Sequence, residues 1–193
     1  MIRLLQNYYK TDDERDAELV GCLRANAANS HLELVVLAEH DLELPGATIV
    51  RVNSRPTFTT VFEYLDSVTG PHDVNVFANC DIRLDETAML FERLPQGHAY
   101  AITRQDALQR DESGTVVDSQ DCWAFRGRIG LAADFYPGEL GCDNRLLWLI
   151  REAGYTIHNP ALSILLHHVH SSGHRDYGVP VPGPYHFIAP AAI

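Results

Sequence analysis

The sequence predicts an α/β fold in which helices flank a mostly parallel sheet. Over the first 78 residues, apolar runs and amphipathic segments follow the order strand, helix, strand, strand, helix, strand. Helices in these places serve as crossovers between parallel strands and cover the faces of the sheet. A chain of 193 residues has the length of one domain with a small appendage. We expect a single domain over residues 1–177 and a proline-rich tail over 178–193.

Four apolar runs in the first half of the chain predict strands. They lie at residues 2–6, 32–37, 49–52 and 74–77. A capping box at residues 11–14 starts a helix after the first run, and apolar residues recur at helical spacing from Leu19 to Ala27. A second helix follows Pro56, because apolar residues from Phe58 to Val68 fall on one helical face.

The second half of the chain combines short elements with loops. Strands are expected at 99–103, 119–125, 156–158 and 163–170, and short helices at 86–94 and 144–153. Asp143 is the expected cap of the second helix, and Gly154 follows it. The polar segment 105–117, with a turn at Ser113-Gly114, predicts a loop. Four prolines leave the tail without a packing pattern, so we expect it to lie over the surface or over a neighbouring subunit.

Composition and charge exclude several classes of function. The net charge of −11 and the pI of about 5.2 argue against a general nucleic-acid binder and against a polybasic membrane-surface protein. Cys22, Cys80, Cys122 and Cys142 form no CxxC pair, which is typical of free thiols in a reducing compartment. The chain has no signal-peptide core and no apolar run approaching about 18 residues. We therefore expect a cytoplasmic protein without a membrane span.

A carboxylate follows the central strand, because the run at 74–77 leads directly into Asn79-Cys80-Asp81. Burying a carboxylate without a partner costs on the order of several kcal/mol, so such an acid is usually paired, metal-bound or exposed to solvent. Ligands of open α/β sheets lie at the carboxyl ends of the strands. Asp81 is therefore a candidate ligand residue, and a loop cap is the plainer alternative.

A second signal is the segment His167-His168-Val169-His170. In a strand, His168 and His170 point to one face and His167 to the other. Two imidazoles one pleat apart can share a metal or a phosphate, or they can be exposed or core histidines at a strand end. An aspartate from another strand would complete a site for Mn²⁺ or Mg²⁺, with diphosphate oxygens filling an octahedron. Such an oxygen-rich donor set disfavours structural zinc.

Two charged residues precede helices. Asp143 can act as a cap, as a base within hydrogen-bond reach of an acceptor hydroxyl, or as both. Arg55 opposes the macrodipole of the helix after Pro56, but it can meet an anion that the same helix end attracts. A surface position in a turn is the alternative for Arg55. Arg175 and Tyr177, just beyond the histidines, are candidates for the same diphosphate.

Several short motifs follow one another in a distinctive order along almost the whole chain, to about Tyr177. They are Leu5-Gln6-Asn7-Tyr8-Tyr9, Ala78-Asn79-Cys80-Asp81-Ile82, Ser119-Gln120-Asp121-Cys122-Trp123-Ala124-Phe125, Gly141-Cys142-Asp143-Asn144, Asn159-Pro160-x-Leu162-Ser163-Ile164, His168-x-His170 and Arg175-x-Tyr177. In this order they resemble a small family of GT-A glycosyltransferases with members in bacteria and in large algal viruses, such as a viral rhamnosyltransferase domain. Asn79-x-Asp81 resembles the Asp-x-Asp motif that holds a divalent metal against a nucleotide-sugar diphosphate.

The resemblance implies a GT-A (Rossmann-like) fold with a mixed, mostly parallel sheet, a UDP- or GDP-sugar donor, a glycan acceptor and Mn²⁺ or Mg²⁺. It implies Asp81, with His170 and His168, as metal ligands and Asp143 as the base of an inverting enzyme. The implied contact residues are Gln6, Tyr8, Arg55, Asn79, Arg175 and Tyr177 for the nucleotide, and Asp121, Trp123 and Asn144 for the sugar and acceptor. At the metal motif the chain departs from the family pattern, because Asn at position 79 leaves the metal one carboxylate fewer.

The favoured function is a metal-dependent transfer of a sugar from a nucleotide-diphosphate sugar to a hydroxyl of a glycan or small acceptor. A nucleotidyltransferase would normally show a glycine-rich, lysine-containing loop after the first strand, where this chain has Gln6-Asn7-Tyr8-Tyr9 and its single lysine, Lys10. A metal phosphohydrolase would need more clustered carboxylates and histidines. A binding module of the same fold without turnover is the non-enzymatic alternative. An oligomer is compatible with each of these.

Overall fold

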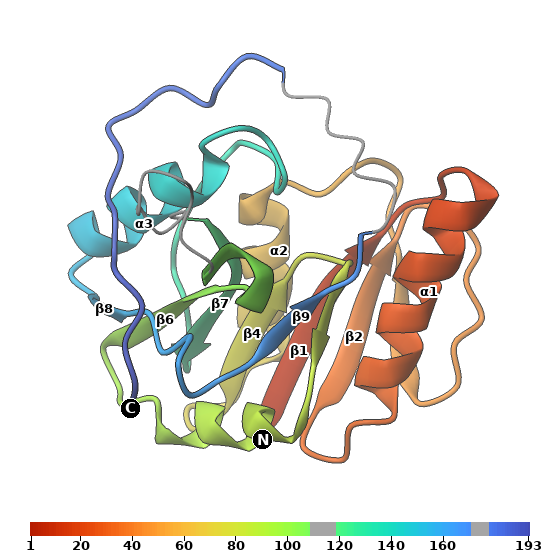
Figure 1. Cartoon of the computed structure of the whole chain (residues 1–193), viewed down its shortest axis with the longest axis horizontal. Coiled ribbons are helices and arrows are strands. Elements are labelled where there is room, and N and C mark those ends of the chain that lie inside the picture. The colour runs from red at the N-terminus through yellow and green to blue at the C-terminus, as the bar shows by residue number, and fades with distance from the viewer. Residues whose placement is uncertain (109–118, 171–177) are drawn as a thin grey trace.

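A seven-stranded sheet forms the middle of the computed structural model, which describes residues 1–108, 119–170 and 178–193 (Figure 1). Its strand order is β3-β2-β1-β4-β7-β6-β8. The strand β7 pairs antiparallel with β4 and β6, and all other neighbours pair parallel. This mixed, mostly parallel sheet confirms the predicted fold class. The strands are β1 (Ile2–Tyr8), β2 (Glu33–Ala38), β3 (Ala47–Arg51), β4 (Val74–Ala78), β6 (His98–Thr103), β7 (Gln120–Arg126) and β8 (Thr156–His158).

Different elements cover the two faces of this sheet (Figure 1). The helices α2 (Phe58–Val68) and α3 (Cys142–Glu152) cover one face. The helix α1 (Asp13–Ala27) covers the other, together with a two-stranded sheet of β5 (Ile82–Leu84) and β9 (Leu166–His168). The 3₁₀ helices η1 (Glu86–Arg93) and η2 (Gln105–Leu108) complete the described elements.

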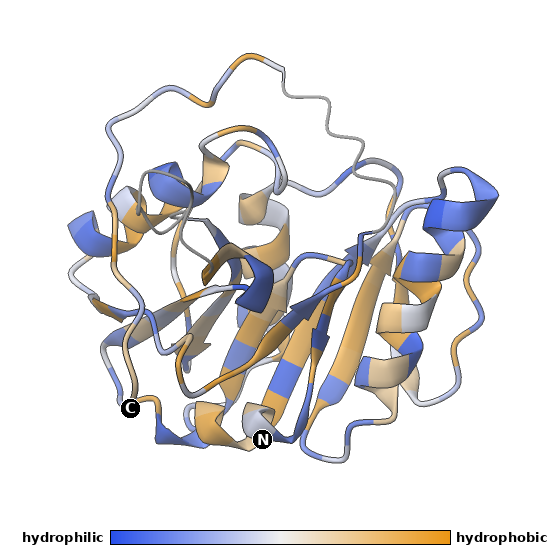
Figure 2. Ribbon diagram, in the orientation of Figure 1, coloured by the Kyte–Doolittle hydropathy of each residue, from blue (hydrophilic) through white to orange (hydrophobic). Residues whose placement is uncertain are grey.

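Successive residues of the central strands point to opposite faces. Leu4 of β1 packs in the apolar cluster on the α1 face, and Leu5 packs in the cluster on the α2–α3 face. The central strands are hydrophobic over most of their length because both faces are covered (Figure 2). The order of strands and helices therefore agrees with the apolar runs of the sequence.

Aromatic rings fill the α2–α3 face. The Trp123 ring stacks on Phe77 with centroids 5.8 Å apart, and its edge meets Phe58 at 5.2 Å. Phe62 and Phe125 form a further edge contact at 5.6 Å. All five side chains are fully or almost fully buried.

The α1 face also buries amide side chains. Asn26 and Gln6 have no exposed surface. The Nδ2 group of Asn26 donates to Gln6 Oε1 at 2.8 Å and to the carbonyl of Ile82 at 2.9 Å, and its Oδ1 accepts from the N–H of Leu84 at 2.9 Å. Asn26 therefore joins α1, β1 and β5.

Several elements differ from the sequence-based expectation: η2 lies within the segment 105–117 expected as a loop, and the apolar pattern does not predict β5. The N-cap of α1 is Asp12, which accepts from the N–H of Arg15, and not Thr11. The N-cap of α3 is Gly141, at a φ of 74° that favours glycine, so Asp143 lies inside the first turn and is not the cap. The segment expected as a strand at 163–170 contains only the three residues of β9. The expected turn at Ser113-Gly114 lies outside the described residues.

The tail at 178–193 lies against its own chain. The N–H of Val181 donates to Leu140 O at 2.9 Å, and the N–H of His186 donates to Asn144 O at 3.0 Å. Further along, the N–H of Ala191 donates to the carbonyl of Asn159 at 2.8 Å. The tail thus crosses α3 and the segment after β8 (Figure 1).

The four cysteines are buried and free, in agreement with the expected absence of disulfides. No helix in the described part of the chain has the length and apolar character needed to cross a bilayer.

Candidate active site

Asp81 lies in the tight turn between β4 and β5, at the carboxyl end of the central strand. The N–H of Ile82 closes the turn on Asn79 O at 3.0 Å. The buried Nε2 of Gln6 donates to Asn79 O at 2.8 Å and to Ile82 O at 3.0 Å. Because Asn26 holds the side chain of Gln6, this turn is anchored to α1.

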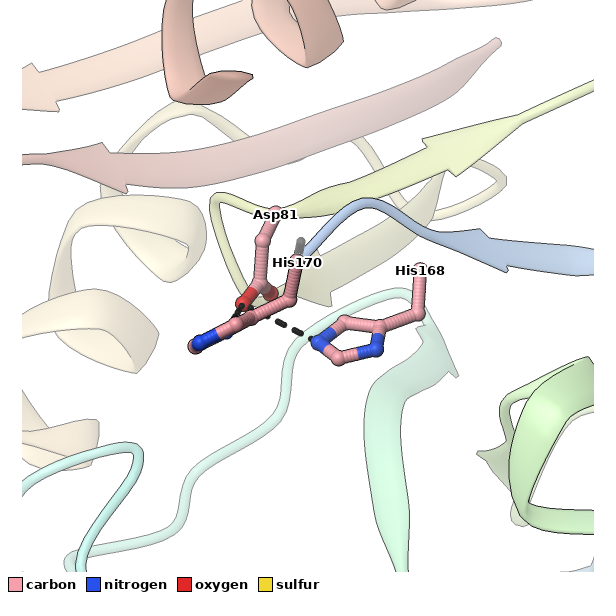
Figure 3. Close-up of side chains that lie close together, drawn as sticks. All are labelled: Asp81, His168 and His170. Atoms are coloured by element: carbon pink, nitrogen blue, oxygen red, sulfur yellow. Dashed lines mark ion pairs between the residues drawn. The ribbon is translucent and has the colours of Figure 1, made fainter. Parts of the chain in front are cut away.

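The pairing of β5 with β9 brings two histidines to Asp81. Ile82 lies opposite His168, and the N–H of Val169 donates to Asp81 O at 2.9 Å. Asp81 Oδ2 lies 3.3 Å from His168 Nε2 and 3.9 Å from His170 Nδ1 (Figure 3). One ligand atom from each of the three residues lies within 4.8 Å of the other two. The structure thus brings together Asp81, His168 and His170, which we call the Asp81 site.

A carboxylate holds the second ring nitrogen of His168. Its Nδ1 lies 3.1 Å from Asp106 Oδ2, on η2. An imidazole that donates Nδ1–H to a carboxylate presents the lone pair of Nε2 to a metal. His167 points away from the site, and its Nε2 lies 2.9 Å from Asp85 Oδ2. The alternation along the strand therefore selects His168 and excludes His167.

Arg15 is a site residue that the sequence analysis missed. Its Nη2 donates to Asp81 Oδ2 at 2.5 Å, and its Nη1 donates to Val169 O and to Glu18 Oε2, each at 2.8 Å. One signal could have identified it: a cation in the first turn of a helix opposes the macrodipole.

Charges around the Asp81 site shift its pKa values. Burial alone raises the pKa of Asp81, but His168 and Arg15 outweigh burial and hold that pKa below its usual value. Burial lowers the pKa of His168, but Asp81 together with Asp106 raises that pKa above its usual value. Burial and the charge of Arg15 lower the pKa of His170. The lowered pKa values of Asp81 and His170 favour the anionic and the neutral form, respectively, which are the forms that bind metal ions. The raised pKa of His168 favours its protonated form, so a metal ion must displace that proton.

A cavity of about 150 Å³ opens beside Asp81. Its lining includes Asn7, Tyr9, Arg55, Asn79, Asp81 and Gly138. Arg55 and Asn79 are expected contact residues that the structure places at this cavity. Asn7 and Tyr9 are lining residues that the sequence analysis did not select.

Gln6 and Tyr8 do not line this cavity, and their expected nucleotide contacts stay predictions. Both side chains point to the α1 face, where Tyr8 donates its hydroxyl to Asp16 at 2.7 Å and Gln6 supports the Asp81 turn. Side chains alternate along a strand, so a motif that ends a strand presents only every second residue to a ligand. Asn7 and Tyr9 have the other parity.

The N-terminus of α2 does not offer the anion site expected beside Arg55. The N–H groups of Phe58 and Thr59 donate at 3.1 Å to carbonyls of the loop 133–135. Arg55 itself donates to the carbonyl of Pro137 at 2.5 Å. The guanidinium therefore faces the cavity without help from the N–H groups at the start of that helix.

Asp121 lies next to Asn79, and Trp123 lies in the core. Asp121 Oδ1 accepts from Asn79 Nδ2 at 2.8 Å, and its Oδ2 lies 3.4 Å from Arg104 Nη1. Burial raises the pKa of Asp121. Trp123 has no exposed surface, and its Nε1 has no hydrogen-bond partner within the described ranges. Sugar contacts by these two residues stay predictions.

Asp143 and Asn144 lie at the start of α3. Asp143 Oδ2 accepts from the N–H of Gln120 at 3.2 Å and so ties the helix to the beginning of β7. The side chain of Asn144 donates to the carbonyl of His186 in the tail at 3.4 Å. The base role of Asp143 and the substrate role of Asn144 stay predictions. Arg175 and Tyr177 lie outside the described residues.

The donor chemistry of the Asp81 site fits a divalent first-row cation. One carboxylate and two imidazoles are ligands for Mn²⁺, and also for Zn²⁺ or Fe²⁺. Three protein ligands leave coordination positions that phosphate oxygens and water can fill. The protein part of the set is less rich in oxygen than the sequence analysis assumed, so zinc is a competitor at this site.

Comparisons with known proteins support the fold and leave the family open. No protein-family model and no curated protein matches the chain, so membership in the family suggested by the motifs has no support at the sequence level. A solved structure that resembles it is the mannosyltransferase PcManGT from Pyrobaculum calidifontis in complex with GDP-Man and Mn²⁺. The TM-score is 0.56 at 16% identity, and the match covers 89% of this chain and 58% of that one. The likeness, to a GT-A mannosyltransferase, is one of fold.

Proposed function

We propose that the chain is a metal-dependent glycosyltransferase that moves a sugar from a nucleotide-diphosphate sugar to a hydroxyl group of a glycan or small acceptor. The observation that carries this proposal is the meeting of Asp81, His168 and His170 beside a cavity at the carboxyl ends of parallel strands. The fold likeness to a mannosyltransferase adds support and makes GDP-mannose the first donor to test. UDP-sugars are the second choice.

The residues around the cavity suit a nucleotide diphosphate. Arg55 provides a cation in the lining of the cavity, and Asp81 of the metal-binding group lines it as well. Tyr9, exposed by 40%, offers an aromatic ring for stacking on a base or ribose. When bound, a divalent cation at Asp81 would stabilise the charge that develops on the leaving diphosphate.

Asp143 is the proposed base for an inverting reaction. The acceptor oxygen would form a bond to the anomeric carbon while the bond from that carbon to the diphosphate oxygen breaks, and the hydroxyl proton would pass to Asp143. Asp143 lies in the first turn of α3, and its Oδ2 accepts from the N–H of Gln120, the residue before Asp121, so both carboxylates lie near the start of this helix. Asp121, held by Arg104 and Asn79, would then position groups and not accept the proton.

The direct test replaces Asp81, the carboxylate that lies next to Arg15, His168 and His170. We expect Asp81→Asn to reduce Mn²⁺-dependent hydrolysis or transfer from GDP-mannose by roughly 100-fold or more, because the anionic ligand is lost. Calorimetric titration with Mn²⁺ should show the matching loss of binding. Asp41→Asn, at an exposed carboxylate paired with Arg51, is the matched control and should behave like the wild type. Near-native activity of Asp81→Asn would contradict the proposal.

Ligand screening identifies the nucleotide, the metal and the alternative functions. A thermal-shift series with GDP, UDP and other nucleoside diphosphates, each with Mn²⁺, Mg²⁺ or Zn²⁺, should single out one base and one ion by mass action. A non-catalytic binding module would be stabilised in the same way but would not consume GDP-mannose. A nucleotidyltransferase would instead join a nucleoside triphosphate to a sugar phosphate and release pyrophosphate from the triphosphate.

A further inference from the structure

Arg15 competes with any cation for the same oxygen of Asp81. Its Nη2 bonds to Oδ2 at 2.5 Å, and the same oxygen is the nearest one to His168 and His170. A carboxylate oxygen paired this closely with a guanidinium is already neutralised. A divalent ion that binds there meets the positive charge of Arg15 and must displace the guanidinium or share the carboxylate with it.

The charges near the cavity make this competition important. The described metal-binding group contains one carboxylate, because position 79 is Asn. Asp81 and Glu18 offset the two cations Arg15 and Arg55, so these four groups have no net charge before a metal arrives. A bound divalent cation would therefore add two positive charges to these four neutral groups, and a diphosphate is a ligand class that offsets this charge.

Arg15 can remain near the cavity when it leaves Asp81. Leu19, one turn further along the same face of α1, lines the cavity. Tyr9, Arg55 and Asp81 line the same cavity, and Arg15 holds Asp81 at its edge. An anion in the cavity would thus give Arg15 a second partner within reach of its flexible side chain.

We propose that Arg15 couples the binding of the cation to the binding of the diphosphate: without a nucleotide it holds Asp81 and weakens the metal site, and with a nucleotide it moves to the diphosphate and releases Asp81. This role rests on the proposed function, because it needs a metal and a diphosphate in the same site. Coupling of this kind is reciprocal, so Mn²⁺ strengthens GDP binding by the factor by which GDP strengthens Mn²⁺ binding.

Two affinities measured on the full chain test the role of Arg15. The first is the affinity for Mn²⁺ alone, followed by electron paramagnetic resonance of the free ion. We expect Arg15→Gln to bind Mn²⁺ roughly tenfold more tightly than the wild type, a typical size for coupling between sites. A purely structural role for Arg15 would instead weaken the site. The matched control is Arg24→Gln, an exposed arginine on the same helix, which should leave the affinity unchanged.

The second quantity is the ratio of GDP affinities with and without excess Mn²⁺. The GDP affinity with Mn²⁺ divided by the GDP affinity without it should be smaller in Arg15→Gln than in the wild type. In this variant only the direct attraction between the metal and the diphosphate remains, because the coupling through Arg15 is removed. Arg15→Lys keeps the charge but not the planar fork, and should bind Mn²⁺ alone more tightly than the wild type by a smaller factor. This variant provides the test if Arg15→Gln does not fold.

The outcomes separate the two proposals. If Arg15→Gln and Arg15→Lys bind Mn²⁺ no more tightly than the wild type, while Asp81→Asn loses binding, the role of Arg15 is overturned and the metal site stands. If wild type and Asp81→Asn bind Mn²⁺ equally well, with or without GDP, the metal site and the proposed function fall together.

Discussion

The two faces of the sheet are held together by different kinds of interaction. The α2–α3 face packs aromatic rings such as Phe58, Phe77 and Trp123 against one another. On the α1 face, Gln6 and Asn26 are fully buried, and their side chains form hydrogen bonds to the turn and strand next to Asp81. Non-directional packing stabilises a scaffold, whereas directional bonds fix the positions of particular atoms.

This difference indicates that stability and site geometry are supplied largely by separate sets of residues. Changes on the aromatic face should lower the free energy of unfolding and leave the folded site intact. Changes on the α1 face should disturb the Asp81 site as well. The variants below test this separation.

The largest expected effect is that of Trp123→Ala. Removing a fully buried ring should lower the free energy of unfolding by about 3–5 kcal/mol, because transfer and cavity costs add. Urea denaturation measures this loss, and the Mn²⁺ affinity of the folded protein should stay unchanged. Trp148→Ala, at the half-buried second tryptophan, is the control and should cost less.

Trp123→Phe is the strictest test of the difference between the two faces. A sugar-binding role, as implied by the resemblance, predicts weaker donor binding with little loss of stability. The packing seen here predicts the reverse, since Phe leaves a smaller side chain among Phe58 and Phe77 but touches no ligand.

An intermediate effect is expected for Asn26→Ala on the α1 face. The substitution leaves the N–H of Leu84 and the Oε1 of Gln6 without their partner, at a cost of about 2–3 kcal/mol. Unlike Trp123→Ala, it should also weaken Mn²⁺ binding, because Asn26 holds β5 beside Asp81. Calorimetry under conditions where the protein is folded measures this. Asn53→Ala, in an exposed turn, is the amide control. Unchanged Mn²⁺ affinity in Asn26→Ala would remove the assigned difference between the faces.

The smallest effect on stability is expected for Asp106→Asn. Asp106 is half exposed, so its loss should change the free energy of unfolding by less than about 1 kcal/mol. Mn²⁺ affinity should nevertheless fall by roughly 10-fold to 100-fold, because the ring of His168 loses the carboxylate that orients it. Glu152→Gln, a half-exposed carboxylate on α3, is the control. Equal Mn²⁺ affinities of Asp106→Asn and the wild type would show that His168 is oriented without Asp106.

The sequence by itself determined the order of the main strands and helices and the candidates Asp81, His168 and His170. These follow from periods of 2 and 3.6 residues and from residue chemistry, which are local properties of the chain. Domain limits and the roles of the remaining site residues rest on the motif resemblance and stay predictions.

Only the tertiary structure decided which segments meet. It pairs β9 with β5 in a separate small sheet, and thereby sets the distances within the Asp81 site. It places Arg15 on Asp81, turns Gln6 inward as a support, and gives Asn7 and Tyr9 to the cavity. The physical reason is that these contacts join residues far apart in the sequence, where pairing register and side-chain direction depend on the packing of the whole fold.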